Sequence, residues 1–406
     1  MRIAVIGGGA AGMAAAYAAA SNGAEAVILE RNEKLGKKLF ISGKGRCNLT
    51  NDSDIEQHLS SVIHNPRFLY SAYHALSPQE LMLLIEGSGV PLKTERGGRV
   101  FPVSDKSSDV LRAWKDLLQS VGAKVRLNER VTSVLKDKEG FTVQTENAKE
   151  HFDKVIVCTG GMTYQATGST GDGYRFAGAL GHTVTELYPA LVGIRADIPN
   201  SLPGLSLKNV EMTVFCKEKK MFSEFGEMLF THSGISGPIV LRTSSRINRE
   251  DLKDINISLD LKPSLSEETL DARLLRDLSA AINKSVKKVL PDWMPKSLIS
   301  LVLSQAGIDP DKPCHSITKE ERHNLCAVVK CIKIKPAGLE EFNGAIVTSG
   351  GVSVGEVNAK DMQSKLVKGL YFAGEILDVD ALTGGYNLQI AFSTGYLAGK
   401  SAATAD

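Results

Sequence analysis

Three glycines close to the start of the chain have the spacing of a phosphate-binding turn. Gly7, Gly9 and Gly12 form the pattern G-x-G-x-x-G directly after the apolar run RIAVI. In such turns the first glycine permits a sharp bend, the second lets the backbone approach a pyrophosphate, and the third lets a helix pack closely on a strand. The free N–H groups of the helix that follows can then bind the pyrophosphate. The pattern predicts a dinucleotide site.

Glu30 is the second part of that signature. It ends the strand expected over residues 25–30 and lies 18 residues after Gly12. A carboxylate at this place accepts hydrogen bonds from ribose hydroxyls, and an acid in place of an arginine favours FAD or NAD over NADP. An ordinary glycine-rich turn is the alternative interpretation.

A second glycine-bearing turn, near the C-terminus, favours FAD. Gly374 and Glu375 follow a short strand in GLYFAGE, and a helix is expected to start near Gly385 in GGYNLQ. A carboxylate after such a strand can bind the ribityl chain, and a helix N-terminus stabilises the negative charge of reduced flavin. The strand and turn KVIVCTGG, residues 154–161, is expected to return the chain to the cofactor. The three segments together predict bound FAD.

The segment KLFISGKGRCNLTN, residues 38–51, is so rich in Gly, Ser and Asn that we expect a loop rather than a helix. Its cations can offset phosphate charge, and Ser42 and Gly43 can donate hydrogen bonds. A solvated basic loop is the alternative. Cys47 lies where related disulfide reductases carry a CxxxxC pair, but the position five residues later is Asp52. One thiol cannot run dithiol exchange, so we expect a packed cysteine rather than a redox-active one.

Three side chains are candidates for catalysis. His232, in FTHSGISGP, can transfer a proton near neutral pH, although a histidine hydrogen-bonded within its own turn is an equal alternative. Tyr386 and Arg99 are candidates for placing a polar substrate. The cysteines and histidines of residues 314–331 suggest zinc, but their spacing matches no common finger, and we expect no metal site.

The candidate cofactor-binding and catalytic residues must be positioned by alternating strands and helices. Residues 1–188 carry that alternation, including an amphipathic helix in SDVLRAWKDLLQS. Short β segments follow in 189–265, which predicts a small barrel or sandwich. A helical pattern bounded by prolines covers 266–335, and strands resume in 336–406.

Several blocks resemble the YhiN/BaiN-type flavoproteins, a bacterial family that includes aminoacetone oxidase-like enzymes and a bile-acid reductase. The most specific are GRCNLTN and GGYNLQ, and the resemblance covers nearly the whole chain. It implies an α/β fold: a glutathione-reductase-type FAD-binding Rossmann domain interrupted by a β-barrel domain that carries a small helical insert. The FAD domain would then take residues 1–188, the barrel 189–265, the insert 266–335, and the return through the barrel edge into the FAD domain 336–406. The residues expected to contact FAD are Gly7, Gly9, Ala10, Ala11, Gly12, Glu30, Arg31, Lys37, Lys38, Ser42, Gly43, Arg46, Cys47, Asn48, Val131, Thr159, Gly160, Gly161, Gly374, Glu375, Gly385, Tyr386, Asn387, Leu388 and Gln389.

Composition limits the class of protein. The 406 residues exceed one ordinary core, so two or three domains are expected. The formal net charge of +2 argues against a dedicated nucleic-acid binder. Six scattered cysteines suit a reduced cytoplasm. Three consecutive glycines interrupt the apolar N-terminus and argue against a signal peptide, no other segment is apolar enough for a membrane span, and no feature indicates an oligomeric state.

These features predict an FAD-dependent oxidoreductase that transfers hydride between flavin N5 and a small organic substrate bound between domains. A single dinucleotide fingerprint means that NAD(P)H, if used, is a transient electron donor. The alternative is a flavin-bound regulatory or nucleic-acid-associated protein without turnover, which would use the lysines of NKSVKKVL, residues 283–290.

Overall fold

Strand β1 (Arg2–Ile6) lies at the centre of a five-stranded parallel sheet, and all its residues after Arg2 are buried. Its register aligns Val5 with Ile28 on one side and Ile156 on the other. A continuous apolar run is what a strand covered on both faces requires. The sheet order is β21 (Leu370–Phe372), β11 (Lys154–Val157), β1, β2 (Glu25–Leu29) and β7 (Lys124–Arg126).

This sheet belongs to the first of two compact units in the structure, a computed structural model that describes residues 1–405. The first unit contains residues 1–190 and the chain from Phe342 onward, and the second contains residues 191–341. No helix within the described residues combines the length and the apolar character that a bilayer span requires.

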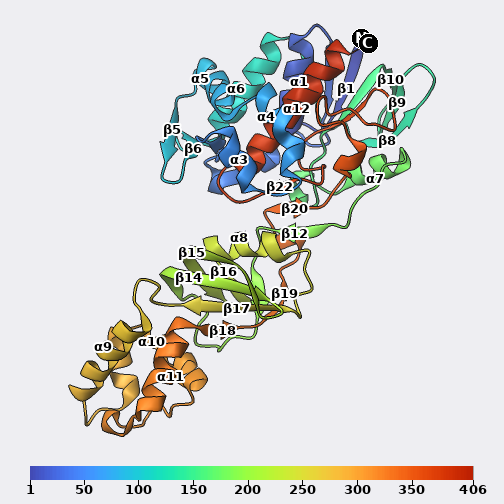
Figure 1. Ribbon diagram of the computed structural model, residues 1–406. Helices are drawn as coiled ribbons and strands as arrows, with labels where there is room; N and C mark the ends of the chain where they lie inside the picture. The colour runs from blue at the N-terminus through green and yellow to red at the C-terminus, as the bar shows by residue number, and fades with distance from the viewer. Residues whose placement is uncertain (406) are drawn as a thin grey trace. The chain divides into compact units, whose positions relative to one another are not determined.

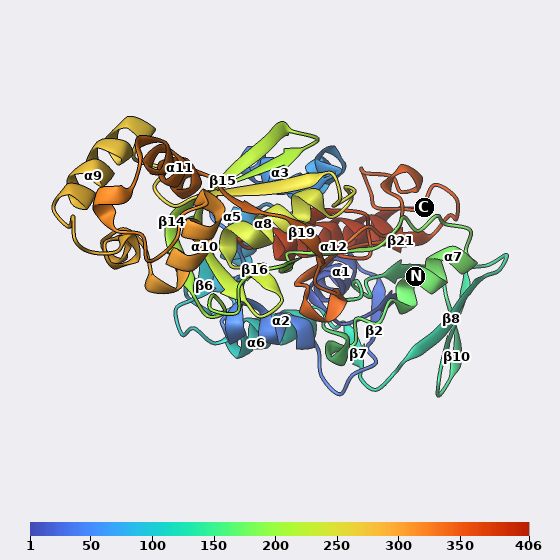
Figure 2. The ribbon, with the colours of Figure 1, turned by 90° about the horizontal axis from the view of Figure 1, so that it is seen from below.

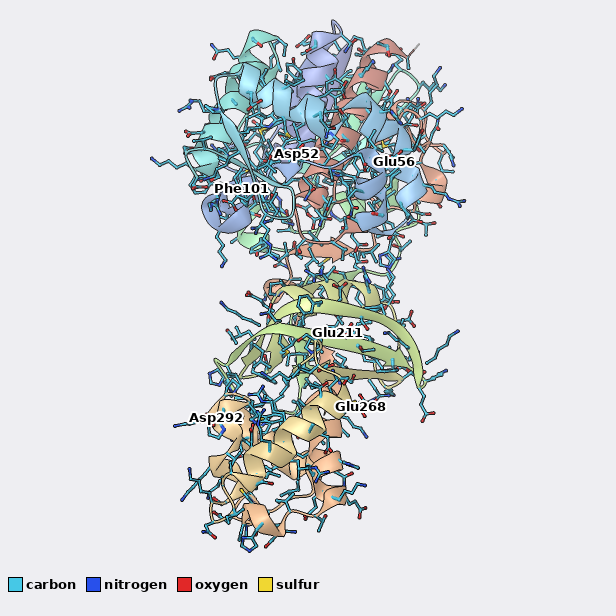
Figure 3. All side chains as sticks on the ribbon, turned by 60° about the vertical axis from the view of Figure 1, so that its left-hand side comes forward. Asp52, Glu56, Phe101, Glu211, Glu268 and Asp292 are labelled. Carbon is cyan, nitrogen blue, oxygen red and sulfur yellow. The ribbon has the colours of Figure 1, made fainter. Side chains whose placement is uncertain are left out.

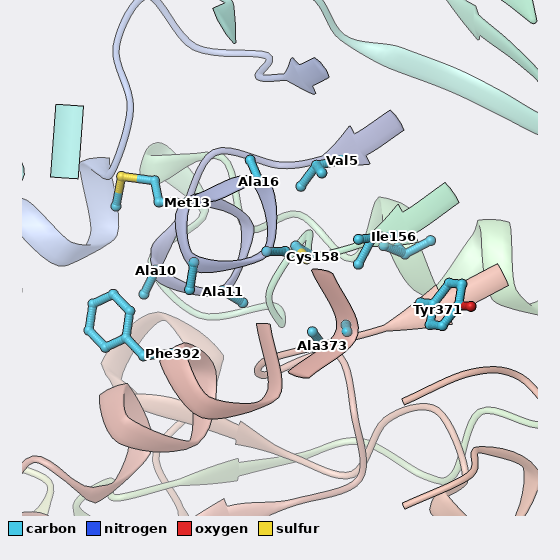
Figure 4. Close-up of a cluster of buried hydrophobic side chains, with 14 of the residues drawn as sticks. Val5, Ala10, Ala11, Met13, Ala16, Ile156, Cys158, Tyr371, Ala373 and Phe392 are labelled. Atoms are coloured by element: carbon cyan, nitrogen blue, oxygen red, sulfur yellow. The ribbon is translucent and has the colours of Figure 1, made fainter. Parts of the chain in front are cut away.

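Two helices from opposite ends of the sequence, α1 (Ala10–Ser21) and α12 (Tyr386–Thr404), lie side by side on the parallel sheet (Figures 1 and 2). They touch through glycines: a Cβ atom added at Gly395 would lie 2.2 Å from the Ala11 carbonyl oxygen, and one at Gly399 would lie 2.0 Å from that of Ala15. Because Gly395 faces Ala11 and Gly399 faces Ala15, the helices run parallel. In Figure 4, Ala10 and Ala11 lie beside Phe392 of α12.

The rest of the first unit surrounds this layer. Phe392 also stacks on Trp114 of α6, with ring centroids 5.0 Å apart, which ties α12 to the amphipathic helix that the sequence predicted. The remaining helices are α2 (Lys37–Ile41), α3 (Ile55–Ser61), α4 (Tyr70–Ala75), α5 (Pro78–Gly87), α6 (Ser107–Ser120) and α7 (Asp172–Ala179). The remaining strands are β3 (Thr50–Asn51), β4 (Val62–His64), β5 (Leu92–Glu95), β6 (Arg99–Pro102), β8 (Val131–Lys136), β9 (Phe141–Thr145), β10 (Lys149–Phe152), β12 (Tyr188–Ala190), β20 (Val347–Ser349) and β22 (Asp380–Ala381).

The second unit is built on a seven-stranded antiparallel sheet. Its two edge strands, β18 and β19, follow each other in the chain with only Lys335 between them, so one extended segment pairs with β17 at one edge and with β13 at the other. A closed barrel stays a prediction. The sheet order is β18 (Ile332–Ile334), β17 (Ile255–Asp260), β14 (Ser206–Cys216), β15 (Lys219–Thr231), β16 (Gly234–Ser236), β13 (Ile194–Ala196) and β19 (Pro336–Leu339).

Helices of the second unit share one hydrophobic core with this sheet. Leu259 of β17 and Leu274 of α9 belong to the same buried cluster. In Figure 3, Glu211 marks the sheet and Glu268 marks α9. The helices are α8 (Pro238–Ile247), α9 (Glu267–Ser279), α10 (Lys296–Ala306) and α11 (Lys319–Lys330).

Two local expectations are wrong. The segment expected as a loop from residue 38 begins with the short helix α2 and continues as a 3-10 turn over Ser42–Gly45. The reason is that Lys-Lys-Leu-Phe-Ile are ordinary helix formers, while Gly36, with φ of +67°, supplies the turn before them. In the second unit, helix α8 lies within residues 189–265, where the sequence predicted short β segments and no helix was foreseen.

Candidate active site

The turn between β1 and α1 has the shape that its first and third glycines require. Gly7 has φ of +101°, and a Cβ atom there would lie 2.6 Å from the Cys158 carbonyl oxygen of the neighbouring strand. A Cβ atom at Gly12 would lie 1.8 Å from the Gly7 carbonyl oxygen. Both glycines are therefore needed by the protein's own packing.

Gly9 is different, because the packing of the protein itself does not require a glycine at this position. A Cβ atom at Gly9 would meet no atom within 4 Å beyond its chain neighbours, and its backbone is extended at φ of −79°. Among the described residues, no side chain caps helix α1, so its first N–H groups are not satisfied by a capping side chain. Open space and unpaired N–H groups at a helix start fit the pyrophosphate of FAD.

Glu30 follows β2 and is 6% exposed. One carboxylate oxygen accepts from the Gly8 N–H at 2.6 Å, and the other accepts from the Asn32 N–H at 2.8 Å. These bonds fix the carboxylate beside the turn and leave lone pairs for ribose hydroxyls. The neighbouring Arg31 donates from Nη1 to Thr170 Oγ1 at 2.6 Å and to Asp172 Oδ2 at 3.2 Å. These bonds hold the start of α7 in place.

Helix α12 begins at a second glycine turn. Gly385 has φ of +101°, and a Cβ atom there would lie 2.2 Å from the Thr50 carbonyl oxygen. With its amide in the orientation that satisfies both neighbours, Asn48 accepts from the Gly385 N–H at 3.1 Å and donates to the Thr50 carbonyl at 3.2 Å. Within residues 1–405, no side chain caps the helix itself. Residues 38–51, which we call the basic loop, thus position the turn before α12. They leave the first N–H groups of the helix available to a ligand.

The side chains of Gln389 and Asn387 hold other segments to α12. Gln389 is fully buried, accepts from Thr50 Oγ1 at 2.6 Å and donates to the Leu76 carbonyl at 3.0 Å. Asn387 accepts from the Ala381 N–H at 3.0 Å and donates to the Ala381 carbonyl at 2.8 Å. Both side chains position the turn. Their predicted contact with the cofactor stays a prediction, as it does for Leu388 beside them.

The two helix starts are staggered along a common direction. Ala11, the second residue of α1, faces Gly395, whereas α12 starts at Tyr386, nine residues earlier. Ala10, the first residue of α1, is therefore level with position 394, and at a rise of 1.5 Å per residue the α12 start lies about 12 Å beyond the α1 start. An elongated dinucleotide with its pyrophosphate at α1 would be long enough to extend toward α12.

Glu375 is the centre of a polar cluster between these starts. Its carboxylate accepts from Lys38 Nζ at 2.6 Å and from the Thr348 N–H at 2.9 Å. A Cβ atom at Gly161 would lie 2.9 Å from the Glu375 carboxylate, so the 159–161 turn passes against it. Within the described residues the buried Thr159 hydroxyl has no hydrogen-bond partner, which fits a polar ligand beside this turn.

Two further cations, Lys37 just before the basic loop and Arg46 within it, are engaged with acids of the protein. Lys37 pairs with Glu33 at 2.8 Å. Arg46 pairs with Glu95 and Asp105, and its guanidinium lies 4.1 Å from the ring centre of Phe101, which Figure 3 labels. The hydroxyl of Ser42 donates to the Leu39 carbonyl, and Gly43 adopts φ of +56°. The expected phosphate contacts of these residues stay predictions.

Cys47 is fully buried, and burial raises the pKa of its thiol to about 12. A thiol with that pKa stays protonated near neutral pH and is a poor nucleophile. Val131, expected to contact the cofactor, is the first residue of β8 and is 5% exposed.

The three catalytic candidates lie in different surroundings. Tyr386 is buried at the α12 start, and its ring meets His58 edge-on at 4.9 Å. Arg99 is exposed on β6 and pairs with Glu95 at 3.6 Å. His232 belongs to the second unit, where it is exposed in the turn between β15 and β16. Their catalytic roles stay predictions.

The residues considered for zinc do not assemble into a ligand set. Among the side chains that the structure describes, no group of three or more metal-ligating residues is close enough to hold an ion. His315 Nδ1 interacts with the Ile282 carbonyl at 2.8 Å, and His323 pairs with Asp271 at 3.7 Å.

Sequence reasoning missed a histidine–carboxylate pair in the first unit. His64 of β4 and Asp380 of β22 are joined at 2.6 Å although 316 positions separate them in the chain. No local motif marks either residue, and only the pairing of the two short strands brings them together.

Comparison with known proteins places this geometry in a family. Residues 1–401 match the family described as the HI0933-like protein Rossmann domain. The chain belongs to the HI0933-like family. It is an FAD-dependent oxidoreductase, as the sequence predicted, and its Rossmann unit is the FAD-binding one.

The relatives of this HI0933-like protein cover nearly its full length. It is 32% identical to a 3-dehydro-bile acid delta(4,6)-reductase of Clostridium scindens, over 99% of each chain. It is 30% identical to a ribosomal RNA dihydrouridine synthase of Escherichia coli, over 97% of this chain and 95% of the relative. Among solved structures, 3-ketosteroid delta1-dehydrogenase from Sterolibacterium denitrificans has a TM-score of 0.54 at 13% identity, covering 100% of this chain and 99% of the other, which shows a shared fold.

Proposed function

We propose that this flavoprotein reduces a carbon–carbon double bond conjugated to a carbonyl group. The relatives' names share that chemistry. A 3-dehydro-bile acid with delta(4,6) double bonds is a conjugated ketone, and dihydrouridine is uridine whose ring double bond, conjugated to a carbonyl, has been reduced. In both cases a hydride adds to an electron-poor carbon and a proton adds to its neighbour.

The observation that carries the proposal is the pair of uncapped helix starts at α1 and α12, staggered by about 12 Å. Bound flavin supplies a hydride donor and acceptor at N5. The N–H groups at α1 would hold the pyrophosphate, Glu30 the ribose hydroxyls and Glu375 the ribityl chain. The start of α12, with its partial positive charge, would stabilise negative charge that develops at the far end of the site.

We further propose NADH or NADPH as the reductant, bound transiently, because the sequence carries one dinucleotide fingerprint and FAD would occupy it. Anaerobic mixing of the yellow protein with either nucleotide should bleach the flavin. A flavin that stays oxidised with both would remove NAD(P)H from the scheme and leave the double-bond chemistry to be tested after dithionite reduction.

The decisive experiment follows reoxidation of the reduced flavin without oxygen. A 3-oxo-4-ene steroid and cyclohexenone are the substrates, and the matched saturated ketones are the controls. We expect the conjugated ketones to restore the yellow colour and to gain two hydrogens by mass spectrometry, while the saturated ketones do neither. If no conjugated carbonyl compound reoxidises the flavin faster than its saturated control, the proposed function is wrong.

An RNA arm belongs in the same experiment. The expectation that nucleic acid is not a partner depends on the net charge of +2, whereas two relatives are named for ribosomal RNA. An unmodified ribosomal RNA transcript and free uridine should therefore be compared with the small ketones. The alternative of a flavin-bound protein without turnover is not favoured by these relatives, and Lys287 of its proposed RNA-binding segment is paired with Asp311 at 2.6 Å.

A further inference from the structure

His64 and Asp380 form a histidine–carboxylate pair of the kind that moves protons. His64 Nδ1 and an Asp380 carboxylate oxygen are 2.6 Å apart, and the Ser349 hydroxyl donates to that same oxygen at 3.0 Å. The Asp380 side chain is 1% exposed, whereas that of His64 is 21% exposed. The carboxylate is thus withdrawn from water, and the imidazole is the part of the pair that a ligand can reach.

The pair holds the imidazole in one orientation. The carboxylate of Asp380 accepts a hydrogen bond from Nδ1 and so leaves Nε2 as the ring nitrogen that can meet a ligand. Within residues 1–405, no hydrogen bond from a protein group to Nε2 is present. The backbone is equally fixed, because Asn65 donates to the Asp378 carbonyl at 2.7 Å and the Leu382 N–H donates to the Ser61 carbonyl at 2.9 Å.

The pair is connected through neighbouring residues to the two groups assigned to the flavin half of the cofactor. Ser349, which binds Asp380, follows Thr348, whose N–H binds Glu375, so the two anchors have Cα atoms about 3.8 Å apart. On the other side, Ala381 follows Asp380 and is held by Asn387 in the first turn of α12. Asp380 therefore connects directly to both places where this chain would contact the flavin half.

We propose that His64 is the catalytic acid of the reduction, with Asp380 and Ser349 as positioning residues. The inference rests on the proposed function. The hydride goes to one carbon of the conjugated double bond, and the adjacent carbon takes a proton from His64 Nε2. The N–H bond of the imidazolium breaks, a C–H bond forms, and the neutral imidazole regains a proton from water.

The test compares His64→Asn with a matched control. Asparagine can keep the hydrogen bond to Asp380 but has no group in place of Nε2. His151→Asn is the control, because His151 also faces a carboxylate, Asp137 at 3.7 Å, but lies 47% exposed on β10. Both variants are prepared as FAD-loaded full chains, with flavin content and melting temperature as checks of folding.

Two measurements decide the outcome. First, we expect substrate-driven reoxidation of the reduced flavin to be about 10²–10⁴-fold slower in His64→Asn, the usual contribution of a general acid, and unchanged in His151→Asn. Second, the midpoint potential of the bound flavin should become more negative in His64→Asn, because a cation next to the reduced anionic flavin is lost. Equal reoxidation rates in the two variants, or equal potentials, would overturn the role of His64.

The second measurement separates this inference from the proposed function. If the wild-type protein reduces no conjugated carbonyl compound, the function fails, but the potential still tests whether His64 lies at the flavin, and an unshifted value overturns the inference. If His64→Asn does not fold, Ser349→Ala takes its place. It removes the hydroxyl that contacts Asp380 at 3.0 Å and His64 Nδ1 at 3.4 Å, and should give smaller changes of the same sign in rate and potential; no change in either would overturn the inference.

Discussion

The starts of helices α1 and α12 are built in opposite ways. At α1 the turn consists of neighbouring backbone and three glycines, and one nearby carboxylate, Glu30, completes it. At α12 the turn is held by side chains that come from far along the chain, including Asn48 and Thr50. Neither helix carries a side-chain cap of its own.

The difference follows from what each start would bind. A pyrophosphate is the same in every dinucleotide and needs only N–H groups and close backbone approach, which a short local sequence can supply. The reacting half of a flavin site must fit a particular substrate and control charge and protons. That requires groups from several segments, here the basic loop, β20, β22 and β4.

The largest effect on stability should come from disrupting the contact between helices α1 and α12, which both starts depend on. In Gly399→Ala the new methyl group meets the Ala15 carbonyl oxygen at 2.0 Å, so the helices must move apart. We expect a loss of about 3 kcal/mol in the free energy of unfolding and a weaker hold on FAD. Urea unfolding measures it.

Gly178→Ala is the matched control for that variant. Gly178 lies in helix α7, and its added methyl group meets nothing within 4 Å. It should stabilise the protein by up to about 1 kcal/mol through helix propensity. If Gly399→Ala behaves like Gly178→Ala, the close contact between α1 and α12 does not determine stability.

The next largest effect should be on FAD affinity, from a change at the α1 start alone. Gly9→Ala places a methyl group in space that the protein leaves open, so the unfolding free energy of the FAD-free protein should not change. The methyl group would occupy the place of the pyrophosphate and raise the Kd for FAD about 10- to 100-fold, or about 1.4 to 2.8 kcal/mol. Calorimetric titration with FAD tests this, with Gly87→Ala at the open end of α5 as control. Unaltered FAD affinity would mean that the pyrophosphate lies elsewhere.

A smaller loss of stability should result from a change at the α12 start alone. Asn48→Ala removes the acceptor of the Gly385 N–H and should cost about 1 kcal/mol of unfolding free energy, the usual value for one hydrogen bond. Asn48→Asp keeps the acceptor and should retain more stability. Equal losses in both variants would show that the bond to Gly385 is not what stabilises the turn. Urea midpoints compare them.

The smallest effect concerns Cys47, which lies between the two starts in sequence. Because burial raises its pKa to about 12, the thiol should not react with iodoacetamide at pH 8, whereas the exposed Cys331 should. The same shift predicts that this thiol's contribution to stability is complete below its unfolded pKa of about 8.5 and is lost as pH rises toward its folded value. Cys47→Ala should leave flavin reduction unchanged. Rapid labelling of Cys47 by mass spectrometry would contradict its burial.

Sequence patterns predicted the α1 half of the molecule almost to the residue, because its determinants are local. The strand at residues 2–6 and the helix start at Ala10 follow from an apolar run and three glycines. At α12 the helix start at Gly385 was predicted from its glycines, but its contacts with Asn48 and Thr50 depend on the packing of segments more than 300 positions apart. His64 and Asp380 were missed for the same reason. Helix α2 was missed because the glycine and serine content of the later residues led to a loop prediction for the whole segment. The five residues of α2 itself are helix formers.

The parallel contact of Ala11 and Ala15 with Gly395 and Gly399 has a consequence for biosynthesis. A ribosome that adds 5–20 residues per second needs about 20 to 75 s to get from Gly9 to Gly385. During that time the growing polypeptide has one half of its cofactor cradle and lacks the other. A cofactor that is held by both helix starts would therefore be loaded only after Gly385 has been translated.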